Sequence, residues 1–168
     1  MKRFLSIAAA SLALVAAQSA SAQSFTTTLN TTFTYDGMSV LVQKGGGPVL
    51  TCTLSIDIIN DGTTIEASNP VLTGFGGACD TVDFLNAPWT VTSLGANLWR
   101  VGTAGTADEI FVDTTITPGD CKGDLVLEYL GGDAFLIDTG FTTPPRSTIP
   151  EDVVGSGDCK VDGVIDNP

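Results

Sequence analysis

Short stretches of alternating apolar and polar residues run through this chain and predict β-strands. The clearest covers residues 52–58, where Cys52, Leu54, Ile56 and Ile58 alternate with polar residues, as expected of a strand with one buried face. After the first 22 residues no stretch shows a sustained helical period. The sequence therefore predicts an all-β fold.

Turn residues separate the predicted strands. Asn60-Asp61-Gly62 predicts a tight turn and Gly131-Gly132-Asp133 a second hairpin, because Gly, Asn and Asp tolerate a positive φ. Strands are expected at residues 25–35, 39–43, 52–58, 63–67, 89–94, 97–101, 109–117, 124–130, 134–138 and 160–165. Short strands at this spacing indicate a sandwich or a barrel.

The first 22 residues have the three parts of a signal peptide. Lys2 and Arg3 precede an uncharged apolar run, and Ala20-Ser21-Ala22 forms a small-residue cleavage site. The run is too short for a stable membrane anchor, and no later stretch reaches about 20 uninterrupted apolar residues. We expect cleavage after residue 22 and one domain over residues 23–168, without a membrane span. Its expected location is extracellular or at the cell surface, with the periplasm as the alternative.

Four cysteines lie beyond the signal peptide, an even number in an exported chain and therefore a sign of two disulfides. Three pairings are open. We favour Cys52 with Cys79 and Cys121 with Cys159, since sequential pairing closes short loops. A zinc site is disfavoured, because the cysteines lack C-x-x-C spacing and the chain has no histidine. Disulfides that tie strand to loop are common in sandwiches, and no repeat suggests regular closure. We therefore expect an antiparallel β-sandwich with Greek-key-like connections.

Charge and the missing histidine exclude several function classes. Without Lys2 and Arg3, five basic residues face 19 acidic ones, a net charge of −14, so binding to nucleic acid or to anionic lipid is disfavoured. The absence of histidine removes Ser-His-Asp and Cys-His catalysis. Glu128 alternates with Val126 and Leu130 and could carry acid–base chemistry, but a carboxylate held by a neighbouring backbone group is the favoured interpretation. We expect no enzyme activity and no cofactor.

Two weaker binding sites remain candidates. Trp99 and Arg100 could face a ligand such as a sugar, with Trp89 assigned to the core. Asp residues beside glycines and cysteines could bind calcium, although their spacing matches no EF-hand loop, and solvated turn residues are the alternative. The calcium candidates are Asp120, Asp124, Asp158 and Asp162, with Asp166 completing a four-residue recurrence.

Five landmarks occur in order along the chain: Cys52-Thr53-Leu54, Gly76-Gly77-Ala78-Cys79, Ala87-Pro88-Trp89-Thr90-Val91, Gly119-Asp120-Cys121-Lys122-Gly123 and Gly157-Asp158-Cys159-Lys160-Val161-Asp162-Gly163. Together they resemble the small exported activator of alkane oxidation (Pra-type) proteins of Gram-negative bacteria. The resemblance implies a non-enzymatic secreted or cell-surface protein that helps cells use or contact hydrophobic substrates such as alkanes, or acts in a biofilm.

Implied partners are a hydrophobic small molecule or a cell-surface or matrix component. The alternative function is an extracellular binding module for carbohydrate or for a calcium-bridged ligand. An exposed apolar patch would favour the first function. A solvent-facing Trp99 beside converging carboxylates would favour the second.

Overall fold

The computed structural model describes residues 32–44, 47–115, 121–139 and 159–167, so the predicted signal peptide lies outside the described residues. Within these ranges the chain forms strands and two short 3-10 helices. The strands are β1 (Thr32–Gln43), β2 (Leu50–Asn60), β3 (Ile65–Thr73), β4 (Val82–Phe84), β5 (Trp89–Gly95), β6 (Leu98–Val101), β7 (Ile110–Thr114), β8 (Cys121–Gly123), β9 (Leu125–Gly131), β10 (Ala134–Asp138) and β11 (Lys160–Asp166), and the helices are η1 (Phe75–Gly77) and η2 (Cys79–Thr81).

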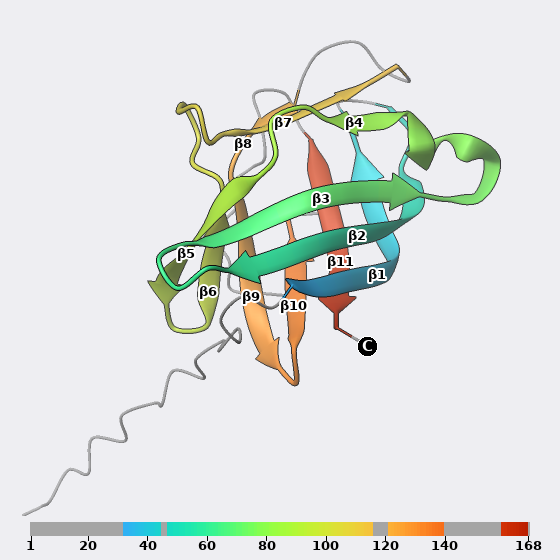
Figure 1. Ribbon diagram of the computed structural model, residues 1–168. Helices are drawn as coiled ribbons and strands as arrows, with labels where there is room; N and C mark the ends of the chain where they lie inside the picture. Colours follow the sequence, from blue (N-terminus) through green and yellow to red (C-terminus); the bar gives the residue numbers. More distant parts are fainter. Residues whose placement is uncertain (1–31, 45–46, 116–120, 140–158, 168) are drawn as a thin grey trace, which may run out of the picture.

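Eight of these strands form a closed antiparallel barrel in the order β1-β11-β10-β9-β6-β5-β3-β2 (Figure 1). The all-β prediction is confirmed, but the predicted sandwich is wrong. Closure depends on the pairing of β1 with β11, between the two ends of the described chain. Because that pairing is non-local, no strand pattern reveals it in advance. It leaves the barrel without the unpaired edges that a sandwich would keep.

A bulge in β1 allows this strand to pair on both sides. Its register with β2 shifts between Met38 and Val40, and Ser39 has a φ of 85°. Beside the bulge, a Cβ atom at Gly37 would lie 2.8 Å from a methyl carbon of Ile165 in β11. Only glycine permits this approach, so the strand can bend sharply and close the barrel.

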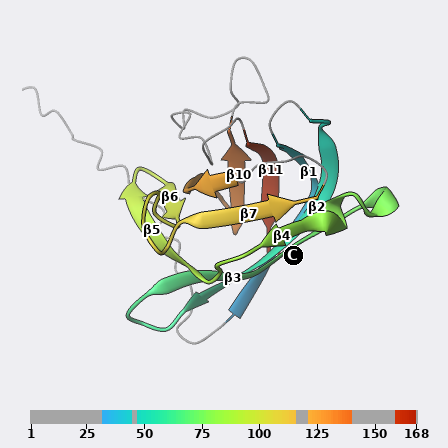
Figure 2. The same cartoon turned by 90° about the horizontal axis from the view of Figure 1, so that it is seen from above.

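The other three strands, β4, β7 and β8, form a small sheet that we call the lid. In chain order the barrel is an up-and-down meander with two excursions: β4 lies within the connection from β3 to β5, and β7 and β8 lie within that from β6 to β9. Both excursions cross the same end of the barrel, as Figures 1 and 2 show. The predicted Greek-key-like connections are therefore replaced by a meander.

Alternation places one face of each barrel strand inside. Along β2 the inward residues are Cys52, Leu54, Ile56 and Ile58, all buried, as predicted. Both predicted turns are found, with a β2–β3 hairpin at 61–64 and a β9–β10 hairpin at 132–133. The pattern missed β4 and β8, because three residues are too few to show a period.

Candidate functional site

An apolar cavity of about 140 Å³ lies inside the barrel at the lid end. Its walls come from barrel strands and from the lid. Barrel residues in the lining include Leu50, Leu72, Trp89, Val101, Leu127 and Ile137, and the lid adds Val82, Phe84, Ile110 and Val112. A cavity of similar size with aliphatic and aromatic walls stays dry and takes up a molecule such as benzene. The site therefore has the size and chemistry for about six carbon atoms.

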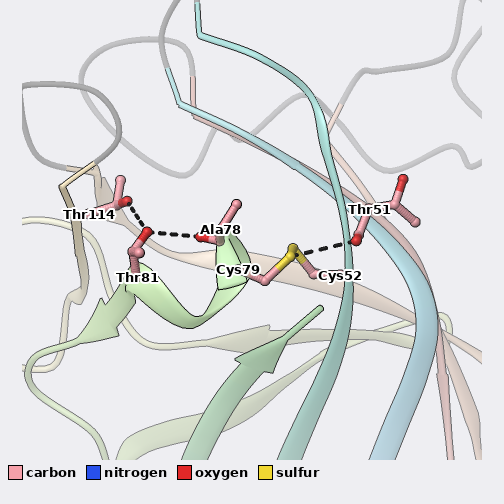
Figure 3. The surroundings of a disulfide bond; sticks show 6 residues. All are labelled: Thr51, Cys52, Ala78, Cys79, Thr81 and Thr114. Atoms are coloured by element: carbon pink, nitrogen blue, oxygen red, sulfur yellow. Dashed lines mark hydrogen bonds between the residues drawn. A yellow bond between two sulfur atoms is a disulfide. The ribbon is translucent and has the colours of Figure 1, made fainter. Parts of the chain in front are cut away.

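Two disulfides hold the lid to the barrel, one at each edge of the lid sheet. Cys79 in η2, just before β4, bonds to Cys52 in β2 (Figure 3). Cys121 in β8 bonds to Cys159, the residue before β11. This is the sequential pairing favoured from the sequence. Since β4 and β8 are the two outer strands of the lid, the roof of the cavity is covalently attached on both sides.

Polar contacts support the first attachment. The Thr81 hydroxyl donates to the Ala78 carbonyl at 2.8 Å and lies 3.2 Å from the Thr114 hydroxyl in β7 (Figure 3). A Cβ atom at Gly74 would come within 2.5 Å of Cys79 Sγ. Glycine is therefore needed where the chain passes the disulfide.

Asn86 connects the lid to the cavity wall. Its side-chain oxygen accepts from the Trp89 indole N–H at 3.2 Å and from the Phe111 backbone N–H in β7 at 3.0 Å. Its amide nitrogen donates to the Glu109 carbonyl. Trp89 is 2% exposed and its ring meets Phe84 edge-on at 5.9 Å. The core position predicted for Trp89 is confirmed, and its polar atom is satisfied without presenting a polar group to the cavity.

Three aromatic rings fill the opposite end of the barrel. Phe135 packs against Tyr35 with ring centroids 5.4 Å apart and against Tyr129 at 5.2 Å. Burial, together with the Asp133 carboxylate, raises the pKa of the Tyr35 hydroxyl far above its ordinary value, so it stays protonated. None of the three rings lines the cavity, which therefore ends above them.

Four polar residues at the lid end complete the lining, and we call them the rim: Gln43, Lys44, Thr114 and Lys160. Lys44 Nζ lies 3.7 Å from a carboxylate oxygen of Asp113 in β7. The Gln43 amide donates to the Gly47 carbonyl at 2.8 Å. Charge at this site is thus confined to the edge of an otherwise apolar space.

The predicted ligand-facing pair lies outside this cavity. Trp99 is half-buried and packs against the core, and Arg100 NεH faces Asp124 Oδ2 at 2.8 Å. Glu128 alternates with the inward Leu127 and Tyr129 and so faces outwards on β9. Neither Glu128 nor the pair Trp99 and Arg100 lines the cavity.

The calcium candidates are not brought together. Asp120 and Asp158 lie outside the described residues. Asp124 pairs with Arg100, whereas Asp162 is buried on β11 opposite Asp138. Asp166, further along β11, is exposed and lies opposite Ala134. In the part of the chain that the structure describes, no group of three or more Asp, Glu, Cys or His residues could hold a metal ion.

Sequence reasoning missed the cavity, Asn86 and the rim. Inward alternation could identify the lining of the barrel strands, but not the space left between their side chains. The clearest overlooked signal was Asn86-Ala87-Pro88-Trp89, in which a polar residue precedes a buried tryptophan. Ala87 and Pro88 are joined by a cis peptide bond.

Comparison with known proteins adds one finding. Residues 1–168 match the family described as alkane oxidation protein activator, PraA/PraB-like. The chain belongs to this family. No curated protein and no solved structure matches it significantly. The resemblance stated from the five landmarks is thus confirmed over the whole chain. Among the residues described, no helix of this family member is long and apolar enough to cross a membrane.

Proposed function

We propose that this protein is an exported, non-enzymatic hydrocarbon carrier that aids alkane oxidation by holding alkane molecules in the cavity beneath its lid. The observation that carries this proposal is the apolar cavity of about 140 Å³ inside the barrel. Eight-stranded barrels are just wide enough to enclose one small ligand. Membership of an alkane oxidation activator family supports alkanes as the ligand class.

Physical chemistry supports an apolar ligand of limited length. Moving a hydrocarbon from water to such a cavity gains about 0.8 kcal/mol for each buried CH₂ group. Six carbons would gain roughly 5 kcal/mol before the cost of immobilisation, which corresponds to weak and reversible binding. Reversible binding suits a carrier that must release alkane to an oxidising system.

The described lining of the cavity supports a carrier. Its walls are aliphatic and aromatic, and its polar residues lie at the rim. Export of the protein would place this cavity outside the cytoplasm, where alkane is encountered. Action in the medium, at the cell surface or in the periplasm follows from the same binding.

Titration with n-hexane tests this proposal. In a Trp99→Phe background, Trp89 is the remaining tryptophan, so hexane in the cavity should change its fluorescence and raise the Tm by mass action. Val101→Phe fills the cavity from β6 and should abolish both responses. Val164→Phe is the matched control, because Val164 is 43% exposed on β11 and does not line the cavity. An unaltered response in Val101→Phe would refute the proposal.

A cellular experiment tests the role in alkane oxidation. Cells that lack the protein should oxidise n-hexane more slowly, and the unchanged chain and Val164→Phe should restore the rate. Val101→Phe should not restore it. Equal rescue by both variants would show that the cavity plays no part.

A further inference from the structure

Two lysines of the rim stand out in so acidic a protein. Beyond the predicted signal peptide the chain has only five basic residues, and Lys44 and Lys160 both line the cavity. They lie close together, since Lys160 pairs in register with Gln43, the last residue of β1, and Lys44 follows it directly. Positive charge is therefore concentrated at the rim of the cavity.

Lys44 is the more unusual of the two. Its side chain is only 10% exposed, and its ammonium nitrogen is shielded from solvent without a hydrogen-bond acceptor among the described residues. The nearest carboxylate, Asp113, is 3.7 Å away and 52% exposed. A charge-assisted hydrogen bond would measure about 2.7–2.9 Å. A buried ammonium usually has an acceptor, so its position favours an anionic group supplied by a ligand.

Lys160 also lines the cavity and is half-buried. It forms no ion pair with any residue in the described ranges. Lysine stems can line an apolar surface while the ammonium group stays at its edge. Both lysines could therefore contact the head of a molecule whose tail lies among the aliphatic walls.

We infer that the preferred ligand of the cavity is an alkanoate of about six carbons, its hydrocarbon tail inside and its carboxylate at Lys44 and Lys160. This inference rests on the proposed function and specifies its ligand. Terminal oxidation of an alkane leads through an alcohol to a carboxylic acid. The same cavity would then take up a product of alkane oxidation more tightly than the alkane itself.

Calorimetric titration with hexanoate, 1-hexanol and n-hexane tests the inference. The protein should bind hexanoate at least about tenfold more tightly than 1-hexanol, because only the carboxylate can form ion pairs with the lysines, whereas the hydroxyl of hexanol accepts at most a hydrogen bond from them. Lys160→Gln and Lys44→Gln should each weaken hexanoate binding about tenfold and weaken hexanol binding much less. Lys122→Gln is the matched control: it makes the same charge change on β8, where Lys122 lies over the Phe111 ring and does not line the cavity.

A substitution with the opposite sign strengthens the test. Asp113→Asn removes the carboxylate that competes for Lys44 and should tighten hexanoate binding several-fold, with a smaller effect on hexanol. This variant and Lys160→Gln keep the test decisive if Lys44→Gln does not fold. Equal affinities for hexanoate and hexanol, or lysine variants that bind hexanoate as tightly as the unchanged chain, would overturn the inference. If n-hexane still bound, the carrier proposal would stand. Failure of all three ligands to bind would refute both.

Discussion

Side chains fill the two ends of the barrel interior to different extents. At the β9–β10 hairpin end, the rings of Tyr35 and Tyr129 both pack against Phe135. None of these three residues lines the cavity. At the lid end, aliphatic and aromatic side chains leave about 140 Å³ unfilled beneath three short strands. Both ends are strongly apolar, so hydrophobicity alone does not distinguish the end filled by aromatic rings from the end that contains the cavity.

The difference shows how stability and binding are separated in this fold. The aromatic end gains dispersion energy from close contact, whereas residues beside the cavity lack partner atoms on one side. Two disulfides attach the lid at the less densely packed end. They constrain the unfolded chain and hold the roof in place without filling the space beneath it.

The largest expected effect comes from truncating the aromatic end. Phe135→Ala should lower the free energy of unfolding by about 3–5 kcal/mol, because Phe135 is 3% exposed and contacts two rings. Urea denaturation followed by circular dichroism measures this loss. Phe84→Ala in the lid is the matched control and should cost about half as much, since Phe84 is only partly buried. Equal losses would show that the two ends are equally well packed.

Removing one attachment of the lid should have the next largest effect. Replacing both Cys121 and Cys159 by Ala opens a 38-residue loop and should cost about 2–4 kcal/mol. Hydrogen exchange should show the larger loss of protection at the β7 amides and a smaller one at Tyr129 and Phe135. Uniform loss at both ends would contradict a lid that opens separately from the barrel.

The smallest expected effect concerns the exposed β2–β3 turn, whose residues neither line the cavity nor contact the three aromatic rings. Backbone N–H groups of Thr64 and Thr63 donate to the Asp61 carboxylate and lower its pKa. A lowered folded-state pKa means that the carboxylate stabilises the fold above its unfolded pKa, near 3.8, and that this contribution disappears as pH falls through the folded value. Asp61→Ala should therefore lower the Tm slightly at pH 7 and not at pH 2. Equal losses at both pH values would rule out this origin.

Local patterns predicted the elements more reliably than their assembly. The strand at 134–138 was predicted with its observed bounds, and the prediction at 52–58 lies inside β2. Residues 39–43 were expected to form a separate strand but continue β1 through its bulge. The sandwich was wrong because the β1–β11 pairing that closes the barrel joins residues far apart in the sequence.

The candidate site was even less accessible to sequence reasoning. The apolar residues of the cavity look like ordinary core positions in the sequence, and Lys44 lies just beyond the strand predicted at 39–43. Trp99 and Arg100 were expected to face a ligand such as a sugar, but the structure gives Arg100 an ion pair with Asp124. Composition reveals which groups are available, and their distances decide which of them can act together.

The sequence by itself determined the strand periodicity, the two turns, the family and the apolar inward faces, because each depends on neighbours in the chain or on matched positions. Only the tertiary structure decided barrel closure, the lid and the cavity. Closure requires a long-range strand pair, and a cavity is the difference between the enclosed volume and the side chains that fill it. That difference arises only after both excursions cross the barrel end, where the β1–β11 pairing places the two rim lysines side by side.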